Sequence, residues 1–310
     1  MQQITIDPKH LQPPTRNDSA GQVPQTLPSV KNSKAHPSKP GSENASIYFV
    51  GNATTILEWQ GVRVLTDPNF LHAGDHVHLG PGLTSTRMHN PAVELHELPR
   101  IDLVLLSHYH EDHFGREVEA SLRRDLPIVT TSHAKSILTP KGMDSFTNVH
   151  NVEPSHQMMI NIASKATDQN VPGLRVTGMP GKHVPLGKPM EMFNDIFGAF
   201  PPINGWMLEC AYGQSSDDFN VGYRIYISGD TLLVDELKEI PRLYGEHNID
   251  SIIGVELMQL VKADITILVH FDDYDIMSES LEEFRMAVGK ADLSGGVLCI
   301  WIGARSIGFV

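Results

Sequence analysis

The segment SHYHEDH, residues 107–113, constrains this chain more than any other feature. Four metal-binding side chains follow the apolar run IDLVLL within six consecutive positions: His108, His110, Asp112 and His113. If the strand continues through SHYH, His108 and His110 point to the same side, because side chains two apart share a face. The chain then turns at ED, so that Asp112 and His113 can serve a second cation beside the first. Imidazole and carboxylate donors in this mixture predict a divalent metal site and suit zinc.

Three further candidate ligands each lie at the end of a predicted strand. They are His183 in VTGMPGKHVP, Asp230 in YISGDT and His270 in ITILVHFDDY. A single histidine at such a position is more often a hydrogen-bonded structural residue, and an aspartate in GDT also suits a helix cap. Two neighbouring metals need more than four donors, however, and strand ends that open into loops are where sites are commonly built. We therefore expect these three residues to complete the site.

The order of predicted elements indicates an α/β protein. Hairpins run from SIYFV to VRVLT, and strands alternate with helices in the last third of the chain, which predicts a sheet sandwich faced with helices. Residues 1–45 are rich in Pro, Ser, Asn, Gln and Lys, and we expect them to be a disordered N-terminal tail because they offer little apolar surface to bury. The remaining residues, 46–310, are predicted to form one domain.

Composition narrows the classes of partner. The chain has 24 Lys and Arg against 37 Asp and Glu, a formal net charge of −13. This balance argues against a nucleic-acid binder and gives no support for a polybasic membrane anchor. Two cysteines are too few for a disulfide framework or a thiolate zinc site. The first residues lack the apolar core of a signal peptide, and no apolar run reaches the roughly 20 residues of a membrane span. We expect a cytoplasmic protein, and its oligomeric state is left open.

In these motifs the chain resembles the metallo-β-lactamase superfamily, whose signature is H-x-H-x-D-H followed by distant His, Asp and His ligands. FVGNATTILEWQGVRVLTDPNF, ELPRIDLVLLSHYHEDHFG and VHFDDYD are similar to the branch that contains N-acyl-phosphatidylethanolamine phospholipase D and the ascorbate-6-phosphate lactonases. Asn52 stands where that branch usually has histidine. The likeness spans roughly residues 46–290 and implies a four-layer αβ/βα sandwich.

The resemblance also implies how the ligands are divided between two metals. His108, His110 and His183 would bind one ion, Asp112, His113 and His270 the other, and Asp230 would bridge them. Asp67 in LTDP would hold an imidazole by its other ring nitrogen, or would be only a turn residue before Pro68.

Two regions depart from the pattern of the superfamily. The stretch between Asp230 and His270 is short, as though one strand-and-loop segment near residue 253 were absent. The C-terminal sequence LSGGVLCIWIGARSIGFV is more apolar than the polar final strand that the resemblance implies.

The implied activity is that of a metal-dependent hydrolase. A metal-bridging hydroxide would cleave an ester, lactone or phosphodiester bond of a small or lipid-like substrate, with two zinc ions, or manganese or iron, as cofactors. Asp112 would orient the nucleophile, and His133 in TTSHAKS is a candidate general acid, although a capping or surface histidine fits that position as well. Two alternatives stay open: a catalytically impaired or dead member of the superfamily, and an iron-bearing redox member.

Overall fold

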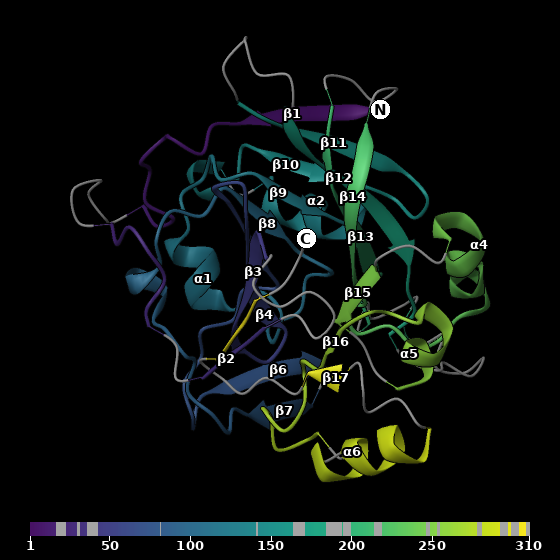
Figure 1. Ribbon diagram of the computed structural model, residues 1–310. Coiled ribbons are helices and arrows are strands. Elements are labelled where there is room, and N and C mark those ends of the chain that lie inside the picture. The colour runs from purple at the N-terminus through teal and green to yellow at the C-terminus, as the bar shows by residue number, and fades with distance from the viewer. Residues whose placement is uncertain are drawn as a thin grey trace.

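Two large β-sheets form the centre of the protein (Figure 1). The computed structural model describes residues 1–16, 23–29, 32–35, 43–80, 82–140, 142–163, 171–183, 194, 200–213, 219–245, 249–252, 255–277, 281–291, 297–298 and 304–307. Within these residues the first sheet has the strand order β1 (Gln2–Ile6), β11 (Gln157–Ile162), β12 (Pro172–Pro180), β13 (Asn204–Tyr212), β14 (Asn220–Ile227), β15 (Ile249–Ile252), β16 (Thr266–Ile267) and β17 (Val297–Leu298). The second has the order β10 (Val149–Asn151), β9 (Ile128–Thr130), β8 (Leu103–Leu105), β5 (Val62–Thr66), β4 (Thr54–Trp59), β3 (Ala45–Gly51), β18 (Ala304–Ile307) and β2 (Asn32–Lys34). A separate hairpin pairs β6 (His76–Gly80) with β7 (Leu83–Thr86).

The main hydrophobic core lies between the two sheets. It joins residues of the second sheet such as Leu103 and Leu105 to residues of the first such as Leu208 and Ile225. Val104, between the two leucines, belongs instead to a core on the other face of its sheet. Side chains alternate between the faces of a strand, so these strands, apolar on both faces, must be covered on both sides.

Helices provide the outer cover. The helices are α1 (Arg116–Ser121), α2 (Ser132–Leu138), α4 (Ile240–Tyr244), α5 (Val255–Val261) and α6 (Leu281–Lys290), with 3₁₀ turns η2 (Leu95–Glu97), η3 (Gly142–Asp144) and η5 (Asp235–Glu239). Val118 of α1 and Leu138 of α2 pack on the second sheet, whereas Met258 of α5 and Phe284 of α6 pack on the first. The predicted αβ/βα sandwich is confirmed. None of the described helices is long and apolar enough to cross a membrane.

The predicted disorder of residues 1–45 is wrong for residues 2–6 and 32–34. β1 pairs in parallel with β11, and Ile6 is buried in the core between the sheets. β2 pairs in parallel with β18. The segment as a whole is polar, but it contains the short alternating sequence QQITI. This sequence pairs with the otherwise open edge that β11 forms in the first sheet. Residues 17–22, 30–31 and 36–42 lie outside the described residues.

The two unusual C-terminal regions are described in part. Residues 253–254, where a segment is expected to be absent, lie outside the described residues, but β15 on one side pairs in parallel with both β14 and β16. In the C-terminal tail, β18 pairs antiparallel with β3, so part of this apolar sequence completes the second sheet.

Candidate metal centre

The candidate ligands come together because each follows the end of a strand. His108 follows β8, and Asp230 and His270 follow the parallel strands β14 and β16. His183 follows β12. The seven residues form two groups, in each of which one donor atom per residue lies within 4.8 Å of the others. The first group is His108, His110 and His183, and the second is Asp112, His113, Asp230 and His270.

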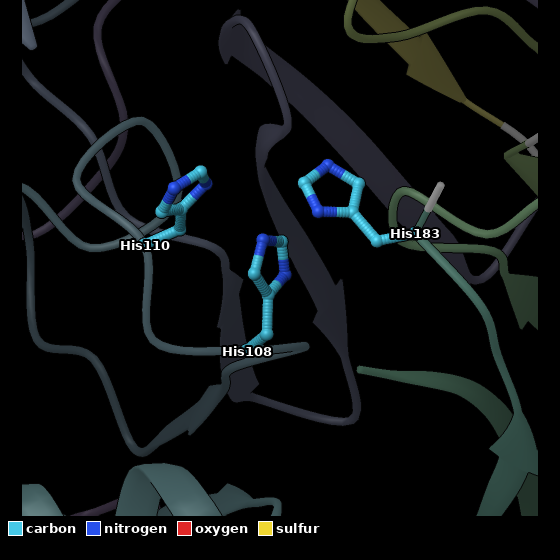
Figure 2. Close-up of side chains that lie close together, drawn as sticks. All are labelled: His108, His110 and His183. Atoms are coloured by element: carbon cyan, nitrogen blue, oxygen red, sulfur yellow. The ribbon is translucent and has the colours of Figure 1, made fainter. Parts of the chain in front are cut away.

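The first group consists of three imidazoles. Their ring centroids lie 5.3 Å apart for His108 and His183, 5.6 Å for His108 and His110, and 5.7 Å for His110 and His183. Figure 2 shows the three rings converging on one space. His108 Nε2 and His183 Nδ1 are buried and have no hydrogen-bond partner among the described residues. Buried ring nitrogens normally have a partner, and a cation between the three rings would accept the lone pairs of these nitrogens.

The second group has the spacing of a tetrahedral ligand shell. His113 Nε2 lies 2.8 Å from Asp230 Oδ2, 3.0 Å from His270 Nε2 and 3.7 Å from Asp112 Oδ2. His270 Nε2 lies 3.4 Å from Asp112 Oδ2 and 3.5 Å from Asp230 Oδ1. Tetrahedral zinc with bonds of about 2.0–2.1 Å separates its ligands by about 3.3 Å. The donor set therefore fits a divalent cation.

Asp230 lies between the two groups. Its Oδ2 atom, 2.8 Å from His113 Nε2, is also 3.5 Å from His183 Nε2 in the first group. A carboxylate with contacts to both groups can be shared by two cations, since each of its oxygens has more than one lone pair.

Asp67 and Ser107 orient two of the histidines. Asp67 Oδ2 accepts hydrogen bonds from His113 Nδ1 at 3.0 Å and from Ser107 Oγ at 2.8 Å, and Oδ1 accepts from the Ser107 backbone N–H at 2.7 Å. Because the Ser107 hydrogen is committed to Asp67, Ser107 Oγ accepts from His108 Nδ1 at 2.9 Å. Both imidazoles thus turn Nε2 toward the site. Asp67 makes the contact with an imidazole that is one of its two expected roles, whereas no sequence pattern points to Ser107.

The charges within the site shift several pKa values. Burial, together with the neighbouring His113, holds the pKa of His108 well below its ordinary value, so His108 is neutral and able to donate a lone pair. Burial also lowers the pKa of His113, but the carboxylates of Asp230, Asp112 and Asp67 outweigh it and raise the pKa well above its ordinary value. Burial disfavours the charged carboxylates of Asp112 and Asp230, yet the histidines around them hold both pKa values well below the ordinary range. The carboxylates of this site thus favour a positive charge beside them, which a protonated histidine or a bound cation can supply.

Asn52 fixes the backbone of two candidate ligands. It lies in the turn between β3 and β4, is completely buried and has φ 51°. Its Nδ2 donates to the Asp112 carbonyl at 2.7 Å, its carbonyl accepts from the His270 N–H at 2.8 Å, and its own N–H donates to Asp273 Oδ2 at 2.6 Å. Sequence reasoning noted only that Asn52 departs from the usual histidine.

Gly229 permits the close approach of Asp230 to the second sheet. Its φ is +58°, and a Cβ atom at this position would lie 3.0 Å from the Ser107 Cβ and from the Asn204 carbonyl oxygen. Only glycine fits this conformation and this space without displacement of the serine that orients His108.

A cavity of about 240 Å³ opens over the candidate ligands. Candidate ligands from both groups line one part of it: His110, Asp112, His183, Asp230 and His270. His133 is not among the lining residues; it lies in the first turn of α2, and burial lowers its pKa. Its role as a general acid stays a prediction.

Comparison with known proteins identifies the family. A sequence model described as the beta-lactamase superfamily domain matches residues 62–250, more than half of the chain. The chain belongs to the metallo-β-lactamase superfamily. The predicted membership is thereby confirmed, whereas the branch stays a prediction. Among related members of known sequence, a UPF0173 metal-dependent hydrolase of Archaeoglobus fulgidus is 25% identical over 264 residues, covering 82% of this chain and 95% of its own. One from Staphylococcus saprophyticus is 22% identical, covering 79% and 93%.

Two solved structures share the fold of this chain. An isothiocyanate hydrolase from Delia radicum gut bacteria has a TM-score of 0.61 at 17% identity and covers 84% of this chain and 98% of its own. Igni18, a metallo hydrolase from Ignicoccus hospitalis, has a TM-score of 0.55 at 17% identity and covers 86% and 99%. At this identity the likeness concerns the architecture of the sandwich, and the chemistry must be argued from the site itself.

Proposed function

We propose that this protein is a hydrolase that uses two divalent cations, with zinc as the preferred metal, to cleave an ester, lactone or phosphodiester bond. The observation that carries the proposal is the position of Asp230 between two adjoining groups of donors, both of which reach the cavity. The related proteins named metal-dependent hydrolases support the same activity.

In this proposal the two groups hold one cation each. His108, His110 and His183 bind the first, Asp112, His113 and His270 bind the second, and Asp230 is shared. The hydrogen bonds of Asp67 and Ser107 support this division, because they leave the Nε2 lone pairs of His113 and His108 directed into the site. Bound divalent cations supply Lewis acidity toward the substrate oxygen and lower the pKa of water.

Asp112 has a further proposed role in orienting the attacking water. Its Oδ2 atom faces His113 and His270, whereas its buried Oδ1 has no hydrogen-bond partner among the described residues and lies 3.2 Å from His110 Nδ1. Oδ1 is therefore available to accept a hydrogen bond from water beside the substrate. A water held in this way would be positioned beside the substrate before it attacks, which would lower the entropic part of the barrier.

The test is metal content by native mass spectrometry, combined with elemental analysis to identify the metal. We expect about two zinc ions per chain in the wild type and fewer in Asp112→Ala and Asp230→Ala. Asp264→Ala, at an exposed aspartate outside the site, is the control and should retain both ions. Zero ions, or one loosely held ion, would contradict the proposal and favour an impaired member of the superfamily. Iron in place of zinc, with redox activity, would favour the redox alternative.

A further inference from the structure

We infer that the cavity selects an uncharged carbonyl substrate that carries an apolar acyl or alkyl substituent, which packs against Leu83 and Ile276. This inference rests on the proposed function and names its substrate class. In the reaction, water adds to the carbonyl carbon, the bond from that carbon to the leaving oxygen breaks, and the products are a carboxylic acid and an alcohol, which takes the second proton of the water.

The first argument is the division of the cavity into a polar and an apolar part. The candidate metal ligands occupy one part, and apolar and aromatic side chains make up the rest: Leu79, Leu83, Phe200, Tyr274, Ile276 and Met277. A volume of about 240 Å³ has room for more than the few atoms of an ester group. A cavity of this kind orients a ligand by its polar end and gains affinity from its apolar end.

The second argument is that the apolar walls are held in place before any ligand binds. Leu79 and Leu83 belong to the β6–β7 hairpin, and the adjoining wall, with Tyr274, Ile276 and Met277, belongs to the segment that follows His270. Asp275 joins them, because its Oδ1 accepts from Ser85 Oγ at 2.6 Å and from the Thr86 N–H at 2.9 Å. Its own N–H donates to the Thr86 carbonyl at 3.1 Å.

A buried ion pair strengthens this connection. Arg87, directly after β7, lies 3.1 Å from the Asp273 carboxylate, and both side chains are almost completely buried. The Arg87 guanidinium also lies 5.1 Å from the centre of the Tyr274 ring. Such a pair is costly to separate, so the two walls should keep their spacing when the substrate enters.

The third argument is the exposure of two apolar side chains, one on each of these adjoining segments. Leu83 is 40% exposed and Ile276 is 47% exposed. Single exposed apolar residues are ordinary on protein surfaces, but these two line the same cavity from two segments that are tied together. A ligand that covers both removes their apolar surface from water, which favours binding.

The fourth argument is charge. Among the described residues that line the cavity there is no lysine or arginine to pair with a phosphate. The chain as a whole carries a formal net charge of −13. Anionic substrates are commonly bound by arginine or lysine, so an uncharged carbonyl compound suits this cavity better than a phosphodiester.

The experiment measures binding of alkyl hydroxamates, from acetyl to octanoyl, to the zinc-loaded protein by isothermal titration calorimetry. Each methylene that enters the apolar part should tighten binding by roughly fourfold until the cavity is filled. Leu83→Ser and Ile276→Ser should each reduce this gain to less than about twofold, while acetohydroxamate binding stays unchanged. Leu243→Ser, at a 58% exposed leucine on α4 that does not line the cavity, is the matched control and should keep the full dependence.

The outcomes separate this inference from the proposed function. If zinc-loaded protein binds every hydroxamate equally, whatever its length, the apolar part of the cavity does not bind the substituent. The inference is then overturned, and the proposed metal centre is unaffected. Protein that holds no zinc would overturn the proposed function and, with it, the inference. Hydrolysis of bis(4-nitrophenyl) phosphate with a higher kcat/KM than 4-nitrophenyl hexanoate would overturn the preference for an uncharged carbonyl substrate.

Discussion

Replacement of Asn52 by glycine tests whether one buried amide holds two segments of the candidate metal centre, those of Asp112 and His270, in place. The side chain is completely buried, and its Nδ2 donates to the Asp112 carbonyl at 2.7 Å, across 60 residues of sequence. Loss of this donor leaves a buried carbonyl unpaired, which costs about 1–3 kcal/mol. Glycine accepts the φ of 51° without strain, so Asn52→Gly removes the side chain and adds no backbone strain. Asn52→Ala should cost about 1–2 kcal/mol more, because alanine resists the left-handed conformation.

Two measurements decide the question. Urea unfolding of the metal-free protein gives the free energy of unfolding, and competition with a chelator gives the zinc affinity. We expect Asn52→Gly to lose about 1–3 kcal/mol. We also expect it to bind zinc roughly 10- to 100-fold more weakly, as is typical when a partner of a metal ligand is removed.

The control for this variant is Gln60→Gly. Gln60 has a nearly equal φ of 50°, but its side chain is exposed and bonds to Tyr212 OH instead of to a ligand. The difference between the two glycine variants isolates the buried amide of Asn52. If Asn52→Gly matches Gln60→Gly in both stability and zinc affinity, the reasoning is refuted.

Three further predictions concern other residues of the structure. Asp67→Asn should weaken zinc binding by roughly 10- to 100-fold, because an amide holds the His113 ring less firmly than a carboxylate; unchanged affinity in the chelator assay would contradict this. Gly229→Ala should lower the free energy of unfolding by about 1–2 kcal/mol, because alanine is strained at a positive φ. Gly289→Ala in α6, where a Cβ has open space, should raise the free energy of unfolding by about 0.5–1 kcal/mol. Equal shifts in the melting temperatures of the two variants would argue against the strain assigned to Gly229. Burial lowers the pKa of His150, so the unfolded chain takes up a proton at this residue before the folded chain does as the pH falls below about 6.5. The free energy of unfolding should therefore decrease below that pH. Urea unfolding at pH 7.5 and at pH 5 should show a smaller decrease in the free energy of unfolding for His150→Gln than for the wild type.

Much of the fold could be predicted from local sequence patterns. Strands such as IDLVLL are apolar on both faces, and helices in the last third have one apolar face. A sandwich of sheets covered by helices buries all of these faces. β1 was missed because the prediction averaged composition over 45 residues, whereas a strand of five residues needs only an alternating pattern and an open edge.

The candidate ligands could also be predicted, but their supporting residues could not. The donors are recognisable because several imidazole and carboxylate side chains grouped at strand ends are most often metal ligands. Ser107 and Asn52 carry ordinary polar side chains, and their importance depends on partners 40 and 60 residues away. No local pattern records such a contact.

The sequence by itself determined which atoms could bind metal and at which strand ends they occur, because donor chemistry and the period of two along a strand are local properties. Only the tertiary structure decided that Asp230 lies between two groups of donors, that Asp67 turns the His113 ring toward it, and that Leu83 faces the same cavity as Ile276. These relations join residues far apart in the chain. They exist only once the two sheets have packed together and brought their loops to one edge.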